Sequence, residues 1–93
     1  MKKFFLLLCF LAAAIAAAGQ NLTVKGTVTD AEGLPVISAG VMVRGTTTGT
    51  VTDMDGQYVL SGVPSDAILE FSSIGYAGQA VPVEGRVVID IVL

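Results

Sequence analysis

The chain has 93 residues, of which 53% are hydrophobic, and a formal net charge of −3 at pH 7. This length limits it to one small domain. Acidic residues outnumber basic ones and no basic cluster occurs, so we expect no binding to nucleic acid, because affinity for a phosphate backbone depends on Lys and Arg.

The N-terminus predicts a cleavable secretory signal peptide, residues 1–19. Lys2 and Lys3 form a basic start, residues 4–18 are an uninterrupted apolar run, and small residues lead to Gly19. A membrane-spanning anchor is the alternative. The apolar run is shorter than the roughly 20 residues that a spanning helix needs, so we favour export, cleavage after Gly19 and a mature domain of residues 20–93.

Cys9 is the only cysteine, and we interpret it as one more apolar residue of the signal because Leu8 precedes it, where an acylated cysteine would follow a small residue. The mature domain then has no cysteine and forms no disulfide. It keeps three basic and eight acidic residues, a net charge of −5, with no polybasic patch for an anionic membrane surface.

Beyond residue 20, apolar and polar residues alternate with the period of two that is typical of strands. The predicted strands cover residues 22–30, 40–45, 49–53, 57–61, 67–75, 76–83 and 86–93. No segment has a helical period of useful length. Parallel sheets need long crossovers, which we do not find, so the spacing predicts an all-β, seven-stranded antiparallel sandwich or barrel.

The alternation also predicts which side chains face the core. On the first strand these residues share one face: Leu22, Val24, Gly26 and Val28. The later strands are expected to contribute Val41, Val43, Tyr58, Leu60, Leu69, Phe71, Val87, Ile89, Ile91 and Leu93. Between the strand cores, glycines mark the turns.

Asp53, Asp55 and Gly56 resemble the start of a calcium loop, in which oxygen ligands alternate before a glycine. In that alignment Val51 and Gly62 fall at two key ligand positions, and neither offers a side-chain oxygen. The alternative is a tight hairpin turn at Asp55 and Gly56, with Asp53 accepting a backbone N–H as an Asx motif. We favour the hairpin and keep calcium binding by Asp53 and Asp55 as the minor hypothesis.

Catalytic and cofactor sites are not indicated. The chain has no histidine and its mature part no cysteine, so Ser–His and Cys–His arrangements cannot form and zinc loses its usual ligands. The Gly45 and Gly49 segment lacks the lysine of a phosphate loop. We therefore expect no enzymatic activity, no catalytic residue, no cofactor and no metal.

Two features could serve binding. Tyr76, and less readily Tyr58, could stack on a sugar ring; alternatively Tyr58 lies in the core and Tyr76 caps one end of it. The threonine-rich residues 46–52 are either a solvated face of strand-forming residues or an open edge that accepts a partner strand.

The order of these motifs resembles the carboxypeptidase-regulatory-like (CarboxypepD_reg-like) domain family. The first part of the family pattern matches Gly26, Val28, Asp30, Gly33 and Pro35. The second part matches Ala39, Val41, Val43, Gly45, Thr46, Gly49, Thr50, Thr52, Asp53, Asp55, Gly56, Tyr58 and Leu60. The resemblance covers residues 22–93.

This resemblance implies a prealbumin-like (Ig-like) seven-stranded β-sandwich. Behind a signal peptide, the domain is most similar to the N-terminal extension of SusC/RagA-type TonB-dependent outer-membrane receptors, which import glycans and other large nutrients. It implies an exported, non-enzymatic module on the periplasmic face that contacts the receptor plug and barrel or the TonB machinery. The alternative is a free-standing secreted carbohydrate-binding or adhesion sandwich.

Two departures from the family pattern bear on these expectations. Ile37 and Ser38 stand where the family usually has Pro-Gly, so the turn into the second strand is expected to differ. The sequence ends at Leu93, before any plug, barrel or TonB box, so we expect either a fragment of a receptor or a stand-alone copy of the module.

Overall fold

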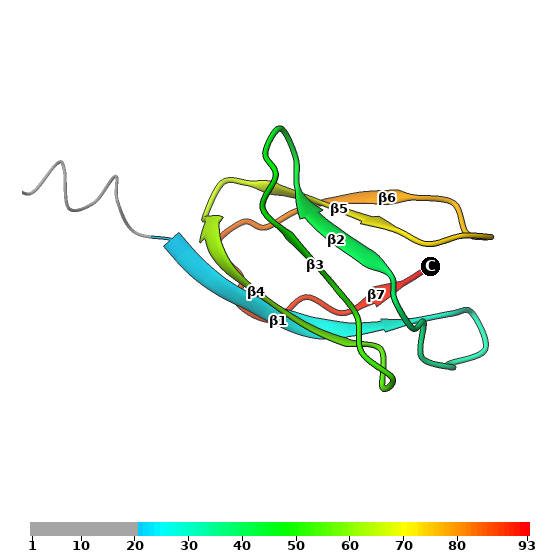
Figure 1. The fold of residues 1–93 in the computed structure, drawn as a ribbon. Coiled ribbons are helices and arrows are strands. Elements are labelled where there is room, and N and C mark those ends of the chain that lie inside the picture. Colours follow the sequence, from blue (N-terminus) through cyan, green and yellow to red (C-terminus); the bar gives the residue numbers. More distant parts are fainter. Residues whose placement is uncertain (1–20) are drawn as a thin grey trace, which may run out of the picture.

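The computed structural model describes residues 21–93, which form two facing β-sheets (Figure 1). The strands are β1 (Asn21–Thr29), β2 (Gly40–Val43), β3 (Gly49–Val51), β4 (Gln57–Pro64), β5 (Ile68–Ser72), β6 (Gln79–Pro82) and β7 (Ile91–Val92). One sheet has the order β4-β1-β7 and the other β3-β2-β5-β6. The predicted all-β sandwich is confirmed, while the predicted signal peptide, residues 1–19, lies outside the described residues.

The described part of the chain contains no helix long and apolar enough to span a membrane.

The core lies between the two sheets and is made almost entirely of aliphatic side chains. Its predicted members are buried: Val24, Val28, Val41, Val43, Tyr58, Leu60, Leu69, Phe71, Ile89 and Ile91. Four further core residues were not predicted: Val36, Ala39, Val63 and Val83. Leu22 and Leu93 pack against this cluster from its margin. The cluster spans residues 24–91, so the described domain contains its own core.

A β-bulge explains why Val63 points inward. Leu22 pairs with Val63 and Val24 pairs with Leu60, so β4 has one more residue than β1 between the two pairs. Gly62 in this interval takes φ 72°, a left-handed conformation that glycine adopts without steric cost. The extra residue resets the alternation, and both Leu60 and Val63 reach the core.

The prediction of purely antiparallel pairing is wrong for β7. β7 runs parallel to β1, with Val28 paired to Ile91 and Thr29 paired to Val92. In the sequence, β2 to β6 lie between these two strands, so the chain forms β4 and the whole four-stranded sheet before it returns to β1. Parallel neighbouring strands need a long connection, and the connection between β1 and β7 consists of strands and loops without any helix.

The predicted strand over residues 86–93 is also interrupted. The Thr27 N–H donates to Asp90 Oδ1 at 2.9 Å, and the Ile89 carbonyl accepts the Tyr58 hydroxyl at 2.7 Å. Regular pairing is therefore confined to an isolated bridge between Lys25 and Val88 and to β7 itself. Val87, which we expected to face the core, is about half exposed.

Gly26 is required where the Ile89 carbonyl approaches β1. A Cβ placed on Gly26 would lie 1.8 Å from the Ile89 oxygen. Gly26 is also the cross-strand partner of Tyr58, whose ring packs edge-on against Phe71 with centroids 5.6 Å apart. The absence of a side chain at Gly26 thus allows the segment around Ile89 to pack against β1, and the Tyr58 hydroxyl holds this segment through its hydrogen bond to the Ile89 carbonyl.

Candidate functional site

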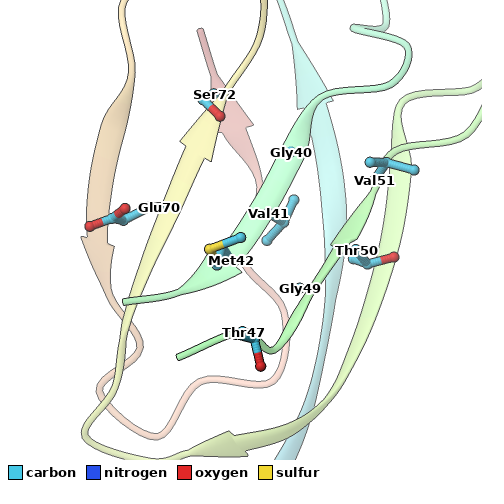
Figure 2. A pocket seen from close by; sticks show the side chains of 9 residues that line it. All are labelled: Gly40, Val41, Met42, Thr47, Gly49, Thr50, Val51, Glu70 and Ser72. Carbon is cyan, nitrogen blue, oxygen red and sulfur yellow. The ribbon is translucent and has the colours of Figure 1, made fainter. Parts of the chain in front are cut away.

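The outer groove is a shallow hollow of about 540 Å³ on the solvent face of the four-stranded sheet. Figure 2 shows Met42 near its middle, with β3 residues on one side and β5 residues on the other. The residues that line it come from β2, β3, β5 and the loop before β3: Gly40, Val41, Met42, Thr47, Gly49, Thr50, Val51, Glu70 and Ser72.

The groove exists because the neighbours of Met42 are small. Gly49 pairs with Met42 on β3, and Gly40 stands two residues before it on β2. A Cβ on Gly49 would lie 3.0 Å from the Val41 carbonyl oxygen, so a side chain at this position would require the neighbouring backbone to shift. Met42 therefore remains about half exposed, as the alternation of β2 predicts.

The groove combines hydroxyls with apolar contacts. Thr47 and Ser72 supply hydroxyls, and Met42 and Val51 supply exposed apolar atoms. Such a surface can hold a flat or extended ligand through hydrogen bonds and apolar contact.

The one carboxylate in the groove is already paired. Glu70 Oε1 lies 2.6 Å from the Arg44 Nε in a solvent-exposed ion pair. No histidine is present in the chain to act as a base for the groove's hydroxyls.

Sequence reasoning did not find this groove. It predicted that Val41 and Val43 face the core, which by alternation leaves Met42 on the outer face, and that residues 46–52 form either a solvated face or an open edge. The structure makes β3 an edge strand. Val51 lies on the outer face of its sheet, whereas Thr50 pairs with the buried Val41 and Thr52 is itself buried. The available signal was Gly40 and Gly49, which flank Met42 in the sheet and leave it uncovered.

The Asp53–Asp55 turn is a corner between the two sheets. The prediction of a hairpin is wrong in one respect, because β3 and β4 belong to different sheets and form no ladder. The tight turn itself is present, closed by the Asp53 N–H bonded to the Gln57 carbonyl at 2.9 Å. Gly56 takes φ 74°, the conformation that an Asp-Gly turn provides.

Asp53 forms the predicted Asx motif. Its Oδ1 accepts the backbone N–H groups of Asp55 and Gln57, both at 2.9 Å. In the loop after β1, Asp30 Oδ1 accepts the N–H groups of Glu32 and Leu34, which also stand two and four residues after the aspartate. Both aspartates therefore stabilise loops of the same design.

Calcium binding by Asp53 and Asp55 stays a hypothesis. Within residues 21–93, no three acidic, histidine or cysteine side chains gather in a metal-binding arrangement. Neither aspartate lines the outer groove. The one geometric role that the structure gives Asp53 is to hold the corner.

Tyr58 is a core residue, and its ring is not accessible for stacking on a sugar. The tyrosine is 3% exposed, and burial together with the nearby Asp90 carboxylate raises its pKa to about 12, while Arg86 acts in the opposite direction. Its hydroxyl therefore remains a neutral donor to the Ile89 carbonyl at physiological pH.

Tyr76 lies in the turn between β5 and β6, is 40% exposed and does not belong to the buried cluster. Its backbone N–H donates to the Ser73 carbonyl at 3.1 Å, which fixes the turn but leaves the ring accessible. Tyr76 does not line the outer groove. Sugar stacking by Tyr76 stays a prediction.

In the turn before β2, Ile37 and Ser38 replace the usual Pro-Gly of the family, but the backbone still adopts a conformation typical of glycine. Ser38 takes φ 58°, a conformation that L-residues other than Asn, Asp and Gly rarely adopt. The turn is held by Thr52, whose buried hydroxyl donates to the Val36 carbonyl and accepts the Ala39 N–H. The Ser38 N–H also donates to the Thr52 carbonyl.

Comparison with curated proteins finds similarity to TonB-dependent receptors. The chain is 45% identical over 85 residues to the TonB-dependent receptor SusC of Bacteroides thetaiotaomicron, a match that covers 91% of this chain and 8% of the receptor. It is 39% identical over 90 residues to a TonB-dependent receptor of Formosa agariphila, covering 97% of this chain and 9% of that protein. The chain thus spans less than a tenth of the length of these relatives.

Among solved structures, the fold matches a chain in the crystal structure of a type II cohesin–X–dockerin complex from Acetivibrio cellulolyticus. The TM-score is 0.59 at 18% identity, over 76% of this chain and 52% of that chain; at this identity the match supports the sandwich fold alone. Residues 24–91 match the family described as the CarboxypepD_reg-like domain. That match spans the whole core, and the chain belongs to this family.

Proposed function

We propose that this domain is the N-terminal, periplasmic module of a TonB-dependent outer-membrane receptor for nutrients, glycans in particular. The observation that carries the proposal is the similarity to TonB-dependent receptors over 91% and 97% of the chain. Export through the predicted signal peptide would bring the domain to the cell envelope. The module would act as a small rigid body through protein–protein contact, without catalysis.

The structure offers two kinds of contact surface that suit this role. The outer groove combines apolar and hydroxyl groups on the sheet face, and the loops at the two ends of the sandwich are free to meet neighbouring domains (Figure 1). The buried polar side chain Thr52 bonds only to backbone groups and is therefore part of the scaffold.

A domain replacement in SusC of B. thetaiotaomicron tests the proposal. The segment that matches this chain is deleted from the receptor, and residues 21–93 of this chain are then inserted in its place. We expect deletion to reduce uptake of the receptor's ligand and the insertion to restore it. A sandwich of similar size from an unrelated family is the control. Failure of residues 21–93 to restore uptake in a receptor present at normal level would refute the proposal.

A glycan-binding module is the second candidate, and the exposed ring of Tyr76 is the observation that favours it. Retention on a polysaccharide affinity gel that disappears in Tyr76→Ala would support this function. The receptor-module proposal predicts no retention that depends on Tyr76.

A further inference from the structure

One end of the sandwich exposes a group of large apolar side chains, which we call the apolar end. It consists of Leu34, Ile37, Met54 and Ile74, exposed by 57%, 53%, 80% and 100%, respectively. Scattered apolar residues are common on protein surfaces, but a group of them on adjoining loops marks an interaction surface. These four residues come from three loops that the fold brings to the same end (Figure 1).

Backbone contacts show that the three loops adjoin. The Val28 N–H donates to the Gly56 carbonyl at 2.7 Å, and a Cβ on Gly56 would lie 3.0 Å from the Pro35 Cβ, so the loops that carry Leu34 and Met54 are packed together. Gly40 pairs with Ser72. The start of β2, just after Ile37, therefore lies beside the end of β5, just before Ile74.

The opposite end of the sandwich differs in composition. Its loops at residues 44–48 and 65–66 consist of Arg, Gly, Thr, Ser and Asp. Exposed apolar residues also occur outside the apolar end, such as Val87 and Val88 before β7, but these are about half exposed, whereas Met54 and Ile74 are exposed by 80% and 100%.

Leu93, the last residue that the structure describes, also lies at the apolar end. The Leu93 N–H donates to the Thr29 carbonyl at 2.8 Å, next to the loop that carries Leu34. The side chain of Gln79 on β6 donates to the Val92 carbonyl, which links β7 to the other sheet. In Figure 1 the C-terminus lies at this end, while β1 begins at the other.

We infer that the apolar end is the docking surface for the receptor segment that follows this domain in the polypeptide. The inference rests on the proposed function, in which more than nine-tenths of the receptor lies outside this chain. A segment that continues from Leu93 is tethered beside the apolar end, and a short tether gives an effective concentration in the millimolar range. Weak apolar contact is then sufficient for docking, and the domain is held in a fixed orientation.

Single cysteines test the inference, because the mature domain has none of its own. Met54→Cys and Ile74→Cys place thiols on the apolar end. Val59→Cys is the matched control, since Val59 is also exposed but lies on β4 in the three-stranded sheet. Maleimide labelling rates are compared between residues 21–93 alone and the same residues inserted into purified SusC, with the unsubstituted chimera as background.

We expect labelling at positions 54 and 74 to be at least tenfold slower in the purified receptor than in the isolated domain, with no change at position 59. Equal rates at all three positions would overturn the inference. Protection that appears only after the purified periplasmic part of TonB is added would assign the surface to TonB instead. Concentration-dependent protection in the isolated domain would assign it to a second copy.

The same chimera separates the two proposals. Normal ligand uptake without protection of positions 54 and 74 would refute docking through the apolar end and leave the receptor-module function intact. Loss of uptake in a chimera that does show protection would count against the function and not against the docking surface.

Discussion

Replacement of Tyr58 by phenylalanine removes one buried hydroxyl and leaves the ring in place. The hydroxyl donates to the Ile89 carbonyl at 2.7 Å, and its loss leaves a buried acceptor without this donor. The cost of an unsatisfied buried group is about 1–3 kcal/mol. For a domain of this size, about 2 kcal/mol lowers Tm by roughly 8–16 °C. We expect Tyr58→Phe to be destabilised by this amount at pH 7.

The pH dependence of the same variant gives a second, independent result. Tyr58 has a folded-state pKa of about 12 against 10 in the unfolded chain, so its neutral form stabilises the fold below pH 10. This contribution is lost as pH rises from 10 through 12, and two pKa units correspond to about 3 kcal/mol. We expect the stability difference between the parent domain and Tyr58→Phe to shrink above pH 10.

Urea denaturation of residues 21–93 at a series of pH values measures both effects. Tyr76→Phe is the matched control, since Tyr76 is exposed and its replacement should change the free energy of unfolding by less than about 0.5 kcal/mol. Equal stability of Tyr58→Phe and the parent domain at pH 7, or a stability difference that stays constant up to pH 12, would refute the role given to this hydroxyl.

Substitutions at four further positions test the loops around the apolar end. Gly56→Ala should destabilise the domain by about 3 kcal/mol or more, because its Cβ would lie 2.5 Å from the Val28 carbonyl oxygen. Gly33→Ala has open space around its Cβ and should cost only about 1 kcal/mol, for its positive φ. Equal losses of stability in thermal denaturation would contradict this expectation. Thr52→Val should lower the free energy of unfolding by about 1–3 kcal/mol, because two buried hydrogen bonds are lost. Thr52→Ser keeps the hydroxyl and should retain most of the stability. A Thr52→Val domain as stable as the parent would show that the hydroxyl is dispensable. Ser38→Gly should be neutral or stabilising by up to about 1 kcal/mol, because it relieves a positive φ; a clear loss of stability would contradict the strain assigned to Ser38.

The alternation of apolar and polar residues was sufficient to predict the fold class and most of the core. It placed Leu69 and Phe71 inward and Met42 outward because each side chain of a regular strand follows a period of two. The prediction failed where the strand is irregular. The bulge at Gly62 turns Val63 inward, and the hydrogen bonds of Tyr58 and Asp90 break the last strand and leave Val87 exposed.

Contacts between distant segments could not be predicted from local pattern. The parallel pairing of β7 with β1 depends on how the chain passes around the other sheet, and the corner at Asp53 depends on which sheet β4 joins. The outer groove and the apolar end were missed for the same reason. Gly40 and Gly49 become neighbours of Met42, and Leu34 a neighbour of the Met54 loop, only after strands and loops are assembled.

The central claim is that this domain is one part of a longer outer-membrane receptor. Mass spectrometry of size-separated outer-membrane proteins from the source cells tests it directly, with peptides from residues 21–93 as the signal. We predict that these peptides occur in a polypeptide far larger than the 9.5 kDa of this chain, together with peptides similar to the rest of a TonB-dependent receptor. Peptides found only in a free protein of domain size in the culture medium would contradict the claim.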